Sequence, residues 1–224
     1  MNLNLVDQLT LLALDDEKGN FVADSFSFAY GLAGAIILEL SLQNKIEIRE
    51  KKIEVNSHKT CGDLLLDHFM DQIRNSKKKR DIQSWVQIIG DKLSFVQEET
   101  VKKLIGDGIL RKKEEKILWV FSNDKYPTIN AKPENELRKR LNDILLNDRK
   151  LDLKESMLIS LIDMCSLNKE VFGKEGAKEY EKKIKAIIEN AKLSSEVGKA
   201  VQEIHDALMM VIVMMLTTTT IINN

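Results

Sequence analysis

The strongest constraint on the fold is the run FAYGLAGAIILELSL at residues 28–42, because it is apolar on almost every side of a helix. Glu39 is its only charged residue. Helices of this kind lie in the middle of a protein, and the glycines and alanines of this one let neighbouring helices approach closely. The sequence therefore predicts a central core helix, with Ser25 or Ser27 as its N-cap.

Shorter amphipathic segments flank this run on both sides. In each of them apolar residues recur at helical spacing and cap residues stand at the start. Trp85 has the spacing of a core residue. Further helices are predicted at 3–14, 63–74, 81–89, 96–105, 133–145, 152–167, 174–192 and 194–216.

Two segments alternate apolar and charged residues, which is typical of β-hairpins with one buried face. The first is KIEIREKKIEV at 45–55 and the second is GDGILRKKEEKILWVF at 106–121. For the second hairpin we predict a turn at 112–116. The residues expected to face the core there are Ile109, Leu110, Leu118 and Val120.

These patterns together predict a mainly α protein, a single helical domain around a central hydrophobic helix with two small β-hairpins. With 224 residues, 43% of them hydrophobic, the chain can bury a sizeable core. We expect the domain to span 1–216 and residues 217–224 to form a disordered tail. The apolar run at 207–216 is shorter than the ~20 residues that a membrane span needs.

Charge and motifs exclude several function classes. The formal charge is -1, whereas proteins that coat nucleic acid usually carry a large basic excess. The sequence contains no GxSxG, HExxH, P-loop or GxGxxG motif. Cys61 and Cys165 lie far apart and the three histidines are scattered, so no metal site is indicated. We predict a non-enzymatic protein without catalytic residues, metal or cofactor.

Basic residues nevertheless cluster at three places, and any attraction to phosphate must come from such local patches. The clusters are Arg74 with Lys77–Arg80, Arg111–Lys113, and Arg138–Arg140. A cation near an anionic bilayer contributes about 1 kcal/mol, so a few together can recruit a protein without net positive charge. The alternative is that each cluster is an ordinary solvated face of a lysine-rich protein.

Several short motifs follow one another in an order that resembles the Golgi phosphoprotein 3 family. Each motif alone is weak, but six in register from Leu5 to about Leu216 are fairly specific. The motifs are LLALDDEKG at 11–19, GLAGAIILELSLQNKIEI at 31–48, GDLLLD at 62–67, Trp85, LIGDGIL at 104–110, and LWVF followed by Tyr126-Pro127. The segment before Phe95 looks shorter than in eukaryotic members, which favours a divergent or prokaryotic relative.

The resemblance implies a single, mainly helical domain and a non-enzymatic peripheral membrane adaptor. The best-known members of the family are cytosolic proteins that bind phosphatidylinositol 4-phosphate on Golgi membranes and hold the cytoplasmic tails of glycosyltransferases. The expected partners are therefore an anionic lipid, phosphatidylinositol 4-phosphate in particular, and cytoplasmic tails of membrane proteins. The expected location is the cytoplasm at a membrane surface, the Golgi if the source is eukaryotic.

The family's lipid site matches this chain at one position. Eukaryotic members combine a tryptophan, an arginine in the central helix and two later basic residues, which fall here at Asp24, Ala33, Glu136 and Lys139. Of these only Lys139 is basic, and its neighbours on the same helix would have to compensate. The predicted lipid- and phosphate-binding residues are Lys139, Arg138, Arg140, Arg111 and Lys112.

A second hypothesis is a winged-helix-like regulator that binds nucleic acid. The helix at 96–105 followed by the hairpin resembles a helix-plus-wing unit, with Arg111–Lys113 on the wing. Against this hypothesis, the chain is nearly neutral and lacks a base-reading helix rich in Arg, Asn or Gln. We therefore consider nucleic acid the weaker prediction.

Overall fold

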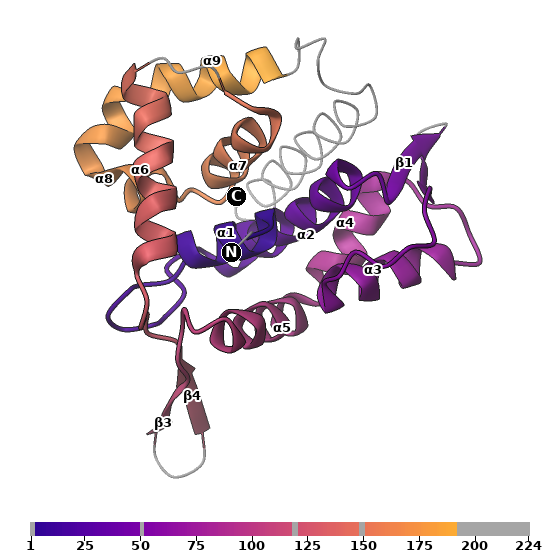
Figure 1. Cartoon of the computed structure of the whole chain (residues 1–224), viewed down its shortest axis with the longest axis horizontal. Coiled ribbons are helices and arrows are strands. Elements are labelled where there is room, and N and C mark those ends of the chain that lie inside the picture. The colour runs from indigo at the N-terminus through magenta and orange to yellow at the C-terminus, as the bar shows by residue number, and fades with distance from the viewer. Residues whose placement is uncertain (1–2, 50–51, 118–120, 148–150, 192–224) are drawn as a thin grey trace, which may run out of the picture.

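A computed structural model of the chain describes residues 3–49, 52–117, 121–147 and 151–191 (Figure 1). Within these ranges it is mainly α with two small antiparallel hairpins, so the predicted fold class is confirmed. The helices are α1 (Leu5–Leu12), α2 (Ser25–Leu42), α3 (Leu64–Arg74), α4 (Ile82–Gly90), α5 (Leu93–Gly106), α6 (Lys132–Asn147), α7 (Leu153–Met164), α8 (Asn168–Glu179) and α9 (Glu181–Ala191). The strands are β1 (Ile46–Arg49), β2 (Lys52–Val55), β3 (Lys113–Ile117) and β4 (Phe121–Lys125).

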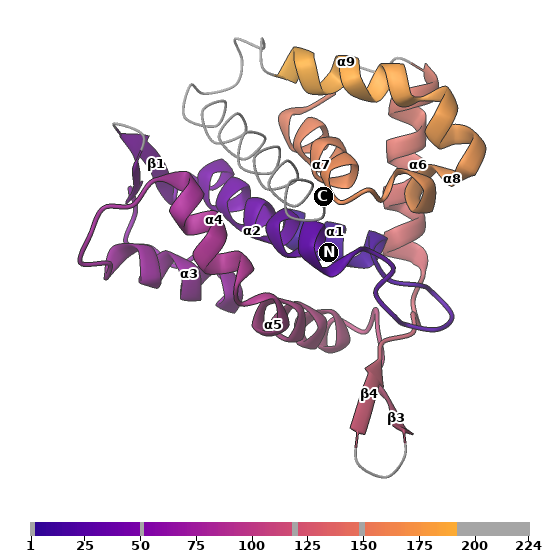
Figure 2. The ribbon, with the colours of Figure 1, turned by 180° about the vertical axis from the view of Figure 1, so that it is seen from behind.

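The helices α1 and α2 run through the middle of the molecule, as the apolar pattern of α2 predicts (Figures 1 and 2). On one side they carry α3, α4 and α5, and on the other α6 to α9. Of the described helices, α2 alone is long and apolar enough to cross a membrane, yet 67% of it is buried within the protein. That burial is typical of a core helix.

The cap of α2 is Asp24, and the prediction of Ser25 or Ser27 is wrong. The backbone of Asp24 is extended, and its carboxylate accepts hydrogen bonds from the N–H groups of Phe26 and Ser27 at 3.0 Å each. Ser25 is already the first helical residue. A carboxylate has two acceptor oxygens, so one aspartate satisfies two of the free N–H groups at the helix start.

The second hairpin differs from its prediction in the position of the turn. The residues predicted as the turn, 112–116, mostly belong to β3, and the pairing continues until Ile117 lies opposite Phe121. A two-stranded ribbon that protrudes from the domain can carry charged residues on both faces, so a charged run does not end the strand. Ile109 and Leu110 are buried as predicted. Leu118 and Val120 lie outside the described residues.

The region predicted as one helix at 174–192 contains the end of α8 and all of α9. α8 itself is interrupted at Gly173, whose φ of 74° is outside the helical region. The chain then changes direction at Tyr180, whose buried ring packs 6.1 Å from that of Phe172. This aromatic contact anchors the corner between the two helices. The predicted helix at 194–216 and the tail at 217–224 lie outside the described residues.

Candidate functional site

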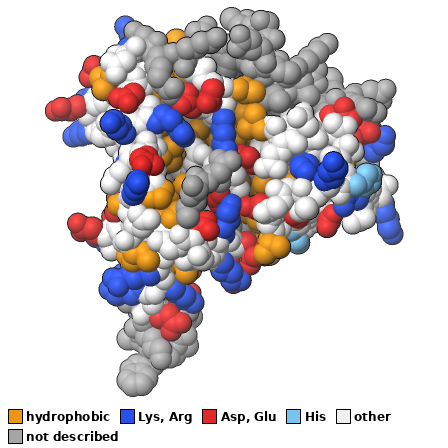
Figure 3. Space-filling model, in the orientation of Figure 1, with side chains coloured by type: hydrophobic (Ala, Val, Ile, Leu, Met, Phe, Trp, Pro, Cys, Tyr) orange, Lys and Arg blue, Asp and Glu red, His pale blue; other side chains and the backbone are white. Residues whose placement is uncertain are grey.

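Helix α6 carries three of the predicted basic residues, Arg138, Lys139 and Arg140, and follows the hairpin β3–β4 in the chain. Its apolar stripe is buried as predicted, which fixes the orientation of the helix. The stripe consists of Leu137, Leu141, Ile144 and Leu145. Figure 3 shows Lys and Arg side chains on this face of the molecule, both along α6 and at the base of the hairpin.

Lys139 is a predicted cation whose side chain faces solvent. It is exposed and lies away from the buried stripe, as the helical spacing predicts. Within the described part of the chain it has no ion-pair partner. Its ammonium group is therefore available to an anion outside the protein.

Arg138 is held inside the fold by contacts to α6 and α8. Its Nε donates a hydrogen bond of 2.8 Å to Glu134 Oε1, and its Nη1 donates one of 2.8 Å to the carbonyl oxygen of Glu170. Only 20% of the side chain is exposed. These contacts assign Arg138 to the packing of α8 on α6, and its binding to a lipid stays a prediction.

Arg140 lies between these two cases, because it is half exposed and weakly paired. Its Nε is 3.5 Å from Glu155 Oε1, and its Nη2 donates to Gln8 Oε1 at 3.3 Å. It lines a hollow of about 510 Å³ between the start of α1 and the first turns of α6. Lys132, exposed at the same hollow, was not singled out from the sequence.

Arg111 and Lys112 stand at the base of the hairpin. The backbone N–H of Arg111 donates to the carbonyl of Pro127 at 3.1 Å, which ties this corner to the segment leading into α6. Lys112 Nζ is 3.0 Å from Asp124 on β4, and this hydrogen bond raises the pKa of Lys112. Lys112 is thus a paired cation, although 47% of its side chain is exposed, and Arg111 is exposed as well.

The remaining positions of the family's lipid site do not offer cations to solvent. Asp24 caps α2, Ala33 is fully buried in the core, and Glu136 is exposed and 4.0 Å from Lys132. In the described residues no group of three or more His, Cys, Asp or Glu could hold a metal ion.

Sequence reasoning missed the residues that border Arg140 in space. Gln8 is 132 positions away in the chain, and no spacing rule connects a glutamine of α1 with an arginine of α6. For Lys132 a signal was available, since it directly precedes Pro133 at the helix start and basic residues follow within two turns.

The chain is similar to known proteins both in a family profile and in an individual relative. The profile of the family Golgi phosphoprotein 3 (GPP34) matches residues 5–204. Vacuolar protein sorting-associated protein 74 of Schizosaccharomyces pombe is 26% identical over 164 residues, which are 64% of this chain and 48% of that protein. The match thus spans about half the length of this relative.

Proposed function

The chain belongs to the Golgi phosphoprotein 3 family, and from this premise we propose that it is a non-enzymatic adaptor that docks on anionic membrane surfaces. The docking surface is the basic face of α6, which we define as Lys132, Lys139 and Arg140. The observation that carries the proposal is the exposure of Lys139, opposite the buried stripe and without an ion-pair partner in the described chain.

The strength of such a face can be gauged from its charges. At about 1 kcal/mol per cation near an anionic bilayer, three cations supply at most roughly 3 kcal/mol, and the exposed Glu136, 4.0 Å from Lys132, lowers this contribution. The contribution is electrostatic and decreases with salt. A force of this size gives weak, reversible binding, so we propose that a second contact, such as the cytoplasmic tail of a membrane protein, adds to it by avidity.

For the lipid itself we propose an anionic head group, with phosphatidylinositol 4-phosphate as the specific candidate. Lys139 is the one family lipid position that keeps its charge in this sequence. Arg111 adds a further exposed cation beside the start of α6. The location that follows is a cytoplasmic membrane surface, the Golgi if the source is eukaryotic.

Vesicle pelleting tests the proposal. The full chain is mixed with neutral phosphatidylcholine vesicles, or with vesicles that also contain phosphatidylserine or phosphatidylinositol 4-phosphate. Charge reversal of two exposed lysines, Lys132→Glu with Lys139→Glu, should weaken binding by at least about 30-fold, because each change removes a cation worth ~1 kcal/mol and adds a carboxylate that the bilayer repels. The matched control is Lys182→Glu, an exposed lysine on α9.

Each outcome has a defined meaning. Pelleting with the phosphoinositide alone supports head-group recognition around Lys139. Equal pelleting with both anionic lipids, released by salt, supports a general basic face. Unchanged binding of the double variant, or equal loss in the Lys182→Glu control, refutes the assignment of α6 as the docking surface.

A further inference from the structure

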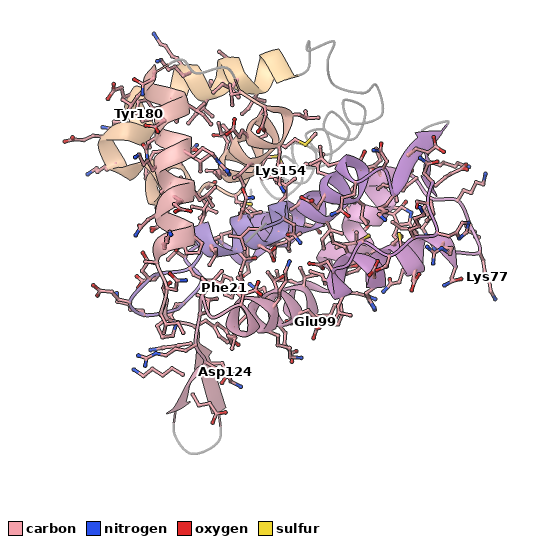
Figure 4. All side chains as sticks on the ribbon, viewed as in Figure 1. Phe21, Lys77, Glu99, Asp124, Lys154 and Tyr180 are labelled. Carbon is pink, nitrogen blue, oxygen red and sulfur yellow. The ribbon has the colours of Figure 1, made fainter. Side chains whose placement is uncertain are left out.

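A second cationic site lies at the end of the molecule opposite to α6, where β2, α3 and α4 meet. Figure 4 labels Lys77 at this end and Tyr180 at the other. A hollow of about 250 Å³ opens here. Its lining includes four cationic residues and one carboxylate, namely Arg74, Lys78, Lys79, Arg80 and Glu54. This is the basic run between α3 and α4, which the docking surface on α6 leaves unused.

Two residues that line this hollow each carry a buried N–H donor without an acceptor among the described residues. The donors are the indole Nε1 of Trp85, a side chain only 3% exposed, and Nε of Arg74. A buried donor without an acceptor costs about 1–3 kcal/mol, and native proteins satisfy nearly all of them. The pair therefore indicates an acceptor that comes from outside the described residues.

The remaining nitrogens of Arg74 are already engaged, and this fixes its side chain. Nη1 is 2.5 Å from Asp71 Oδ1, and Nη2 is 3.5 Å from the carbonyl oxygen of Ser57. The terminal nitrogens thus hold the guanidinium group in place from α3 and from the segment after β2. Nε is the nitrogen of this side chain that has no partner among the described residues.

The basic loop beside these donors is also held in place. The N–H of Ile53 on β2 donates to the carbonyl of Arg80 at 3.0 Å. Within the loop, Ser76 Oγ donates to the carbonyl of Lys78 at 2.7 Å. These bonds fix the backbone while the side chains of Lys77–Arg80 stay exposed. Little ordering is then needed when an anion binds.

One of the cations is engaged with the single carboxylate of the lining. Lys79 Nζ lies 2.7 Å from Glu54 Oε1. This ion pair leaves Lys78 and Arg80 as exposed cations beside the hollow. The site thus combines fixed N–H donors with unpaired positive charge, which is the combination that binds oxyanions in proteins.

We propose that this hollow binds a phosphate group of the kind carried by a phosphomonoester. The N–H groups of Trp85 and Arg74 donate to its oxygens, and Lys78 and Arg80 neutralise its charge. A tetrahedral dianion presents several strong acceptors and also the negative charge that matches Lys78 and Arg80, whereas a water molecule accepts at most two hydrogen bonds and carries no charge. The phosphate can belong to a soluble compound or to a lipid head group, and the two sources are separated below.

Titration of the full chain with inorganic phosphate tests the site. The readout is the indole N–H resonance of Trp85, assigned with the variant Trp119→Phe, which removes the other tryptophan. We expect a saturable shift of this resonance. An indole resonance that does not move as phosphate is added overturns the proposal.

Variants then distinguish the site from general charge attraction. Trp85→Phe keeps an aromatic ring but loses the N–H, and Arg74→Gln loses the charge; each should lower phosphate affinity about tenfold or more, as expected for a hydrogen bond to a charged group. If either of those substitutions prevents folding, Lys78→Gln tests the phosphate affinity instead, because it replaces an exposed side chain. The matched control is Lys77→Gln on the same loop, whose side chain is exposed and outside the lining. Equal loss in Lys77→Gln and Lys78→Gln refutes a defined site.

A last comparison distinguishes a soluble phosphate compound from a lipid head group as the ligand. It also tests this site independently of the docking surface on α6. Vesicles with phosphatidic acid present a phosphomonoester at a membrane, whereas inorganic phosphate presents it in solution. If Lys78→Gln weakens both, the site accepts lipid head groups; if it weakens only the soluble ligand, the source is soluble. Lys132→Glu with Lys139→Glu should leave phosphate binding at Trp85 unchanged, so either proposal can fail alone. Loss of phosphate binding in that double variant contradicts a separate site.

Discussion

Lys103 on α5 places its Nζ 2.6 Å from the carboxylate of Asp63, the residue that caps α3. The same Nζ is 2.6 Å from Oδ2 of Asp7 on α1. Asn4 Nδ2 also donates to Asp63, at 3.0 Å. One ammonium group thus connects three helices, and the Asp63 of the GDLLLD motif has a structural role in this protein.

Replacement of Lys103 by Met should destabilise the fold. Burial raises the pKa of Asp7, and the hydrogen bond from Lys103 opposes that rise, so without the lysine a buried carboxylate loses its main partner. We expect a loss of about 2 kcal/mol, less than for a fully buried pair because 35% of the Lys103 side chain is exposed. Urea unfolding followed by far-UV circular dichroism measures it.

The neighbouring Lys102 provides the control for this experiment. Among the described residues it pairs with Glu98 and Glu99 alone, both on its own helix, and 59% of its side chain is exposed. Lys102→Met should leave the urea midpoint unchanged. If both variants unfold at the same urea concentration as the natural protein, Lys103 does not hold the three helices together.

Much of the helical fold was predictable because its signals are local. The all-round apolar run gave α2, and the stripe from Leu137 to Leu145 gave the buried side of α6. The errors arose where tertiary structure overrides local signals. The charged β3 continues as a strand in a protruding ribbon, and the turn at Tyr180 depends on a contact with Phe172.

The candidate sites were less predictable, because a side chain's availability depends on distant partners. Clustering alone treats Arg138 and Lys139 as equivalent, yet Arg138 is held by the carbonyl of Glu170 on α8 and Lys139 is not. The sequence marked Trp85 as a core residue, which is correct. That its N–H lies buried without an acceptor in the described chain, beside a basic loop, follows only from the three-dimensional arrangement.

Gly31 marks a close contact between α2 and α7, and Gly31→Ala should destabilise the protein. An added Cβ at Gly31 would lie 2.2 Å from Cys165 Sγ, far inside the contact distance. We expect a cost of about 1–3 kcal/mol from overpacking, measured by urea unfolding. In the double variant Gly31→Ala with Cys165→Ala the clash is removed. The loss of unfolding free energy in the double variant should therefore be smaller than the sum of the losses in the two single variants.

Gly106→Ala is the control for this prediction. Nothing lies within 4 Å of a Cβ added at Gly106, at the end of α5. The change should not destabilise the protein, because alanine is the better helix former. Strict additivity of Gly31→Ala and Cys165→Ala would mean that the two residues are not in contact.

Restoring the arginine of the family's lipid site at Ala33 should damage the fold without a gain in lipid binding. Ala33 is fully buried, so the new guanidinium group would lie in the core without a partner. We expect a loss of about 3 kcal/mol or more in the free energy of unfolding.

The matched change is Glu136→Arg, at a side chain that is 69% exposed. It should fold normally and strengthen pelleting with anionic vesicles; a stable Ala33→Arg variant would show that this position is open to solvent.

Glu134 should make the stability of the protein depend on pH. Burial raises its pKa to about 7, although Arg138 acts in the opposite direction and Asp16 adds to the rise. Between the ordinary value of 4.5 and about 7, the folded state binds a proton that the unfolded state has released. The contribution of Glu134 is therefore fully present below about 4.5 and is lost as the pH rises to about 7, a change of roughly 3 kcal/mol.

Urea midpoints measured at both ends of this pH window test the effect of Glu134. Glu134→Gln removes the titrating group but keeps an oxygen that can accept a hydrogen bond from Arg138. The stability of this variant should therefore fall much less than that of the natural protein as the pH rises. Glu136→Gln, at an exposed position on the same helix, should retain it. Arg138 donates hydrogen bonds to both Glu134 and the carbonyl of Glu170. Ionisation of Glu134 should therefore affect the contact that positions α8 on α6. If Glu134→Gln keeps the full pH slope, the titrating group lies elsewhere in the chain.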